Sequence, residues 1–183
     1  AAIVDRTMTL TLILLAIVAT GVSGIPAAFG GRKAKSGERI ATTLVVLGSA
    51  AGLVGAFHVA ITGREASWSM PWDVPGGELA VRVDALAAIF LVQIFAIVPL
   101  ASIYGLEYWP QRDHPTNGRK LRLFYGLLTA SMAILVVAHN AIFFLMGWEG
   151  MALAAFLVVT TDDTDTAVRE AGYVYLVATR IGT

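Results

Sequence analysis

Residues 7–29 read TMTLTLILLAIVATGVSGIPAAF, a long stretch without Asp, Glu, Lys or Arg. Residues 40–62 and 85–106 form two more uncharged stretches of similar length. The hydrocarbon core of a bilayer is about 30 Å thick, and an α-helix needs about 20 apolar residues to cross it. Each stretch is long enough for this and therefore predicts one membrane-spanning helix.

A fourth stretch, residues 123–161, is interrupted only by Glu149 and is much longer than the other three. One straight helix over this whole range would measure about 58 Å, nearly twice the bilayer core. We expect the chain to turn at the polar pair His139 and Asn140, because Asn accepts the left-handed backbone conformation of tight turns. Together with a helix that follows an Asp-rich loop, the predicted helices cover residues 7–29, 40–62, 85–107, 121–138, 141–161 and 167–183.

The composition agrees with a membrane protein. Hydrophobic residues make up 57% of the chain and charged residues 14%, against about 45–50% and 25% in soluble domains. The 13 basic residues balance the 13 acidic ones, so no basic field favours nucleic acid, and the absence of Cys excludes disulfides and iron–sulfur ligation. The predicted fold is an all-α integral membrane bundle of five complete transmembrane helices plus the start of a sixth. We expect residues 1–183 to form a single membrane domain within a larger polypeptide.

The segment between the second and third predicted helices has a different pattern. A turn at Pro75, Gly76 and Gly77 precedes residues 79–83, in which apolar side chains alternate, as is typical of a strand. We expect a small extracytoplasmic hairpin here.

Basic residues indicate the orientation, because cytoplasmic loops carry an excess of Lys and Arg. Two loops and their edges hold Arg32, Lys33, Lys35, Arg39, Arg112, Arg119, Lys120 and Arg122, whereas the opposite side holds Arg6, Arg64 and Arg82. The sequence therefore predicts a multi-pass protein of the cell inner membrane with its N-terminus on the periplasmic side.

Glu149 is the candidate functional residue with the most unusual position, near the middle of the predicted helix 141–161. It lies about 12 Å from the outer end of that helix and about 18 Å from the inner end. An ionised carboxylate at this depth costs at least about 2.5–3.5 kcal/mol, so such residues usually face a partner or water and serve ion or proton movement. We predict a proton relay at Glu149; the alternatives are a helix-to-helix salt bridge and a permanently neutral Glu.

Arg180, His139 and His58 are the other predicted members of the relay. Arg180 lies about 20 Å from the inner face, at a depth similar to that of Glu149, so it can pair with Glu149 or face residues beyond this chain. His58 and His139 fall near the outer face, where a proton exit path and simple interfacial hydrogen bonds are the two explanations. Two histidines without a third ligand do not make a metal site, and we predict no metal, cofactor or catalytic residue.

Three segments resemble one family of membrane proteins. Residues 143–157, FFLMGWEGMALAAFL, are similar to the WE-x-M-x-L-x-S-[FYW]-L helix of the antiporter-like subunits found in respiratory complex I, Mrp-type cation/proton antiporters and membrane-bound hydrogenases. Residues 82–90, RVDALAAIF, and 171–183, AGYVYLVATRIGT, resemble the start of its third helix and its sixth helix. The sequence of residues 171–183 most resembles that of the formate hydrogenlyase and hydrogenase-4 type of subunit.

This resemblance implies a subunit of about fourteen helices built from inverted repeats, of which this chain would be the N-terminal part. It also implies that Glu149 is a proton-channel residue that works with a lysine on a later helix, whereas the acid expected three residues after Arg180 is replaced by Thr183. The expected function is a proton-translocating membrane subunit of a hydrogenase-like or NADH:quinone oxidoreductase-type complex. This chain would catalyse no redox step itself, and its partners would be the lipid bilayer and the other membrane subunits of that complex, with protons or Na+ as the coupling ion. A non-translocating scaffold and an independent cation/proton antiporter are the alternatives.

Overall fold

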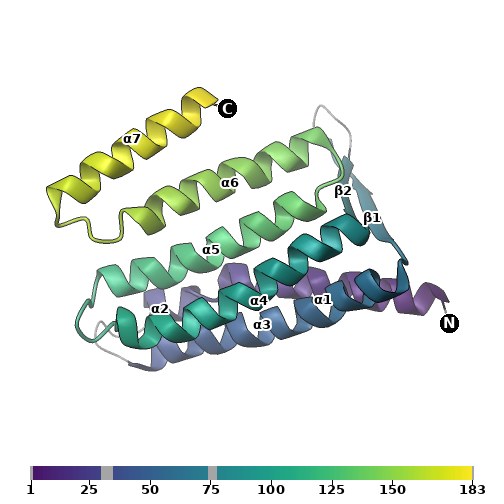
Figure 1. The fold of residues 1–183 in the computed structure, drawn as a ribbon, viewed down its shortest axis with the longest axis horizontal. Coiled ribbons are helices and arrows are strands. Elements are labelled where there is room, and N and C mark those ends of the chain that lie inside the picture. Colours follow the sequence, from purple (N-terminus) through teal and green to yellow (C-terminus); the bar gives the residue numbers. More distant parts are fainter. Residues whose placement is uncertain (1, 30–34, 74–77, 183) are drawn as a thin grey trace.

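The computed structural model describes residues 2–29, 35–73 and 78–182, with side chains from Arg6 onward. Its elements in chain order are α1 (Ala2–Val22), α2 (Ile25–Phe29), α3 (Lys35–Thr62), β1 (Ala66–Pro71), β2 (Glu78–Val83), α4 (Ala85–Tyr108), α5 (Asn117–Val137), α6 (Ala141–Val159) and α7 (Thr166–Gly182). In Figure 1 the long helices α1, α3, α4, α5 and α6 run along a common direction, with the hairpin at one end and α2 at the other.

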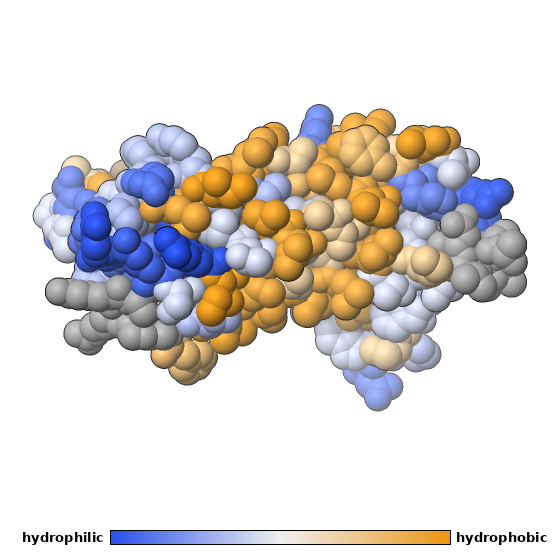
Figure 2. Space-filling view, turned by 90° about the horizontal axis from the view of Figure 1, so that it is seen from below, coloured by the Kyte–Doolittle hydropathy of each residue, from blue (hydrophilic) through white to orange (hydrophobic). Residues whose placement is uncertain are grey.

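Five helical segments in the described part of the chain are long and apolar enough to cross a membrane: Arg6–Phe29, Lys35–Thr62, Ala85–Tyr108, Asn117–Val137 and Ala141–Val159. Figure 2 shows the corresponding surface, a hydrophobic band across the middle of the molecule with hydrophilic residues toward both ends. The predicted all-α membrane fold with a small hairpin is therefore confirmed.

The first predicted helix, residues 7–29, is not continuous. The chain breaks at Ser23 and Gly24, between α1 and α2. The Ser23 hydroxyl donates to the Thr20 carbonyl at 2.6 Å, and a Cβ added to Gly24 would lie 2.2 Å from the Cα atom of Leu123 on α5. The break thus lets the backbone of the first span lie directly against the backbone of α5.

The predicted turn at His139 and Asn140 is confirmed, but the stated reason for it is wrong. Asn140 has φ −138° and ψ 160°, an extended conformation, and its side chain accepts a hydrogen bond from the Phe143 N–H at 2.8 Å. Asn140 is therefore the N-cap of α6, where a side-chain oxygen satisfies a backbone N–H that the helix leaves unpaired.

The hairpin closes the bundle at the end where α3 finishes and α4 begins. β1 and β2 pair in antiparallel register from Ala66 with Val83 to Pro71 with Glu78, while the predicted turn at residues 75–77 lies outside the described residues. The Val81 and Val83 side chains are buried, and the His139 N–H donates to the Ala80 carbonyl at 2.9 Å. Backbone hydrogen bonding thus joins the hairpin to the α5–α6 connection.

The core lies between α1, α3, α4 and α5. Gly52 and Gly55 on α3 face it, and a Cβ on Gly52 would lie 2.5 Å from the Phe95 ring of α4. Small residues at helix contacts let backbones approach closely in lipid, and Gly52 has this role between α3 and α4.

Candidate functional site between two helices

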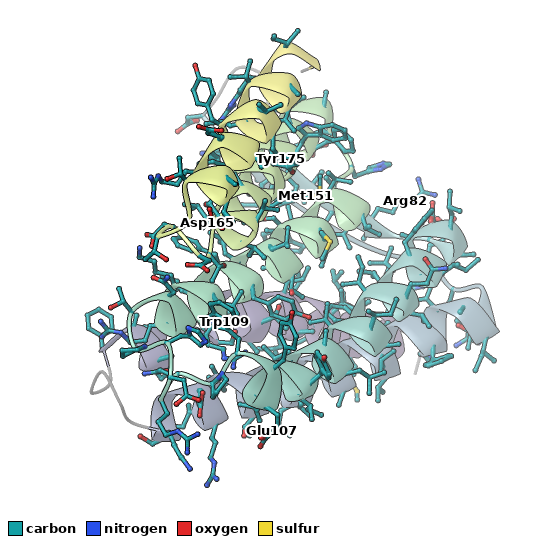
Figure 3. All side chains as sticks on the ribbon, turned by 60° about the vertical axis from the view of Figure 1, so that its left-hand side comes forward. Arg82, Glu107, Trp109, Met151, Asp165 and Tyr175 are labelled. Atoms are coloured by element: carbon teal, nitrogen blue, oxygen red, sulfur yellow. The ribbon has the colours of Figure 1, made fainter. Side chains whose placement is uncertain are left out.

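Glu149 lies half-way along α6 and forms an ion pair with Arg180 of α7, in which the Arg180 guanidinium donates to Glu149 Oε2. The Glu149 side chain is 34% exposed and that of Arg180 46% exposed. Of the two arrangements that the sequence left open, the structure therefore shows the pair. Figure 3 labels Met151, two residues after Glu149 on α6, and Tyr175, five residues before Arg180 on α7.

The residues beside Glu149 attach its helix to α5. A Cβ on Gly147 would lie 3.1 Å from Ile134, and a Cβ on Gly150 would lie 2.9 Å from the Ser131 hydroxyl. Both neighbours belong to α5, so the two glycines set the rotation of α6. This rotation leaves Glu149 directed to α7 and places the Ser131 hydroxyl close to the same turn of α6.

The two histidines lie away from this pair, at the hairpin end of the bundle. His58 is one turn from the end of α3, and its Nδ1 shares a hydrogen bond of 3.0 Å with the Thr9 hydroxyl of α1. His139 is exposed in the connection between α5 and α6. Since helices rise 1.5 Å per residue, the start of α6 lies about 12 Å along the helix from Glu149. The structure thus brings together Glu149 and Arg180 and places the histidines near one end of the spans.

A second pair of ionisable side chains, Glu38 and Arg122, lies buried at the opposite end. Their carboxylate and guanidinium are 3.9 Å apart, with side chains 7% and 6% exposed. Glu38 accepts a hydrogen bond from the Gln111 N–H at 2.8 Å, while Arg122 donates to the carbonyls of Gly105 at 2.7 Å and Trp109 at 3.3 Å. The pair therefore fastens the α4–α5 connection to the first turn of α3.

Sequence reasoning did not single out this pair: Arg122 entered only the charge count of a loop, and Glu38 had no assigned role. The available signal was position, because Glu38 precedes an uncharged stretch by two residues and Arg122 directly precedes another. A charge so close to a predicted span needs a partner if the helix continues through it.

Loop carboxylates at this end are also paired. Lys120 Nζ donates to Asp163 Oδ2 at 2.6 Å, and this hydrogen bond holds the pKa of Asp163 below its usual value. Arg112 contacts Asp113 at 3.0 Å and lowers the pKa of that carboxyl in the same way. Two basic residues of this end, one in α5 and one in the α4–α5 connection, are therefore paired with acids.

Taken together, the five apolar spans and the ion pair between α7 and the mid-point of α6 define a multi-pass helical membrane protein with a charged site between two helices. The chain is similar to chain 5 of NADH-ubiquinone oxidoreductase from Chondrus crispus, with 26% identity over 96% of this chain and 26% of that protein. The corresponding protein of Talaromyces marneffei is also 26% identical, with the same coverage.

Subunit L of NADH-quinone oxidoreductase from Mycobacterium tuberculosis is 31% identical over 91 residues, 48% of this chain and 14% of the relative. The chain thus spans about a quarter of the length of the relatives that it matches throughout. No protein-family profile matches it.

Proposed function

We propose that this chain is part of an antiporter-like membrane subunit of a complex I-like NADH:quinone oxidoreductase. The similarity to chain 5 of that enzyme extends over 96% of the chain, and the five apolar spans suit a subunit embedded in a membrane. Its partners in this proposal are the other membrane subunits of the complex, and the chain itself carries out no redox chemistry. The relatives described above are named as subunits of NADH-ubiquinone or NADH-quinone oxidoreductase, so the narrower assignment to the hydrogenase-4 type stays a prediction.

Glu149 serves in this proposal as a site where a proton is taken up and released near the middle of the membrane. The observation that carries the proposal is its ion pair with Arg180 on the neighbouring helix. Lipid surroundings favour the neutral acid and the guanidinium favours the carboxylate. When Arg180 moves away, Glu149 binds a proton; when Arg180 returns, the proton leaves.

His58 and His139 would take part at the periplasmic end, where both lie close to the hairpin. Histidine is a common proton shuttle in proteins. In the proposed orientation, with the N-terminus in the periplasm, a proton leaving Glu149 toward the outer face would meet these residues last.

The test replaces Glu149 in the complete complex, reconstituted into vesicles. We expect Glu149→Gln to leave assembly and quinone reduction measurable and to abolish redox-driven acidification, recorded with a pH-sensitive dye. Glu149→Asp keeps an acid and should retain part of the proton transport. Glu170→Gln is the matched control, because it removes an exposed carboxylate of α7 outside the ion pair.

The alternative functions correspond to other outcomes of the same assay. Unchanged proton transport in Glu149→Gln, with loss of assembly only when the subunit is deleted, would establish a scaffold. Exchange that depends on sodium and continues without NADH or quinone would establish an independent antiporter. Either result would refute the proposed relay.

A further inference from the structure

A cavity of about 700 Å³ lies at the end of the bundle opposite the hairpin. Its walls come from α2, α5, α6 and α7 and from the connections beside them. The lining residues used below are Arg119, Lys120, Phe124, Phe156, Asp163, Arg169 and Tyr173. It is separate from the Glu149–Arg180 pair, and neither of those residues lines it.

The lining changes from charged to apolar over one helical turn. On α5, Lys120 is followed four residues later by Phe124; on α7, Arg169 is followed four residues later by Tyr173. Residues four apart lie above one another on a helix, separated by about 6 Å along the axis. The cavity therefore has a charged mouth at the end of the spans and apolar walls toward the membrane centre.

The mouth is net positive. Arg119, Lys120 and Arg169 supply three cationic groups, and Asp163 supplies the one carboxylate among the lining residues. Asp163 is already engaged by Lys120 at 2.6 Å. Arg169 donates to the backbone carbonyls of Asp163 and Thr164, at 2.7 and 3.2 Å, and to the Thr166 hydroxyl at 3.0 Å, all of them neutral acceptors.

We propose that this cavity binds an anionic phospholipid. The phosphate would lie at Arg119 and Arg169, and an acyl chain would extend along Phe124, Phe156 and Tyr173. A phospholipid matches the cavity because its anionic headgroup is joined to hydrocarbon chains. Basic pockets between transmembrane helices are suited to such headgroups. This inference requires only that the chain spans a membrane and does not depend on the proposed proton relay.

The first experiment measures lipid binding to the delipidated full-length protein by native mass spectrometry. Phosphatidylglycerol should bind at least tenfold more tightly than phosphatidylcholine, and excess inorganic phosphate should not displace it. Arg169→Gln should weaken binding about fivefold, as expected for one basic residue near a lipid headgroup. Arg112→Gln removes the same charge at the same end of the molecule but outside the cavity, and it should have no effect.

The variant Asp163→Asn separates an effect of charge from damage to the fold, because damage would weaken lipid binding. Removing the one carboxylate of the lining makes the mouth more positive, so phosphatidylglycerol should bind more tightly rather than less. Equal affinity for the two lipids, displacement by phosphate, or unchanged binding in both Arg169→Gln and Asp163→Asn would each overturn the proposal.

A crosslinking experiment identifies the occupant directly. Benzoylphenylalanine placed at Leu157, a lining residue of α6, should attach to lipid on illumination of the full-length protein in its membrane. A crosslink to a peptide of the same polypeptide, of a second copy or of another subunit would show that protein fills the cavity and would refute the lipid site.

Discussion

The carboxylate of Glu38 lies 3.9 Å from the guanidinium of Arg122, and both side chains are almost completely buried between α3 and α5. Each group also binds backbone atoms: Glu38 accepts from Gln111 in the α4–α5 connection, and Arg122 donates to Gly105 in the last turn of α4 and to Trp109. Helix ends that are far apart in the sequence are thus held together by one charged cluster.

Removing one member of this pair should destabilise the protein strongly. Loss of one partner from a buried ion pair typically costs about 3–5 kcal/mol, because the remaining charge stays buried. We therefore expect Glu38→Gln and Arg122→Gln each to lower the thermal unfolding midpoint clearly, measured in detergent. Glu107→Gln is the control, since Glu107 is exposed on α4 (Figure 3), and a comparable effect there would contradict the argument.

The contact between Gly52 and Phe95 gives a second prediction. A methyl group at Gly52 would meet the Phe95 ring at 2.5 Å, and overpacking a close-packed core typically costs about 1–3 kcal/mol. Gly52→Ala should lower the unfolding midpoint, and the added change Phe95→Leu should recover part of the loss. Gly182→Ala should be neutral, because a Cβ there has no neighbour within 4 Å. Equal stability of Gly52→Ala and the parent would show that α3 and α4 are less closely packed.

Asp163 predicts a pH dependence. The hydrogen bond from Lys120 lowers the pKa of Asp163 in the folded protein. This contact therefore stabilises the folded protein to its full extent at any pH well above the pKa of the unfolded state, about 3.9. The contribution is lost as the pH falls through the lowered pKa of the folded state. The difference in melting temperature between the parent and Asp163→Asn should be constant near neutral pH and should shrink below about pH 4. A difference that grows on acidification would contradict this assignment.

The orientation can be checked with introduced cysteines, because these 183 residues contain none. With the N-terminus in the periplasm, Ser69→Cys in β1 should react with a membrane-impermeant maleimide added outside cells. Thr164→Cys, in the connection between α6 and α7, should react only after the membrane is opened. The reverse pattern would place the N-terminus in the cytoplasm.

Much of the fold followed from uncharged stretches, because crossing a bilayer requires long apolar helices. The ends of the helices were predicted less accurately. The helices α3 and α5 begin at Lys35 and Asn117, several residues before the predicted starts, because a search for uncharged stretches excludes the charged residues there. Glu38 and Arg122 are tolerated there because each is the partner of the other. Such a pairing depends on tertiary packing, which is absent from a local pattern.

The candidate site could be predicted only in part, because its pairing also depends on tertiary packing. The depth of Glu149 could be counted along the sequence, but its pairing with Arg180 depends on how α6 and α7 are rotated. That rotation is set by contacts such as those of Gly147 and Gly150 with α5. The wrong explanation for Asn140 has a related cause, since a turn and an N-cap favour the same residue type.

Among the described residues of α7, Gly172 is the one that is buried. A Cβ added there would lie 2.0 Å from the Thr160 methyl group. This point can act as a pivot. Arg180 lies about 12 Å farther along the helix, so a tilt of about 10° would carry the guanidinium roughly 2 Å. This movement is enough to open or close its contact with Glu149 while the core between α1, α3, α4 and α5 stays undisturbed. A small tilt of α7 would thus decide whether the Glu149 carboxylate has a positive charge beside it.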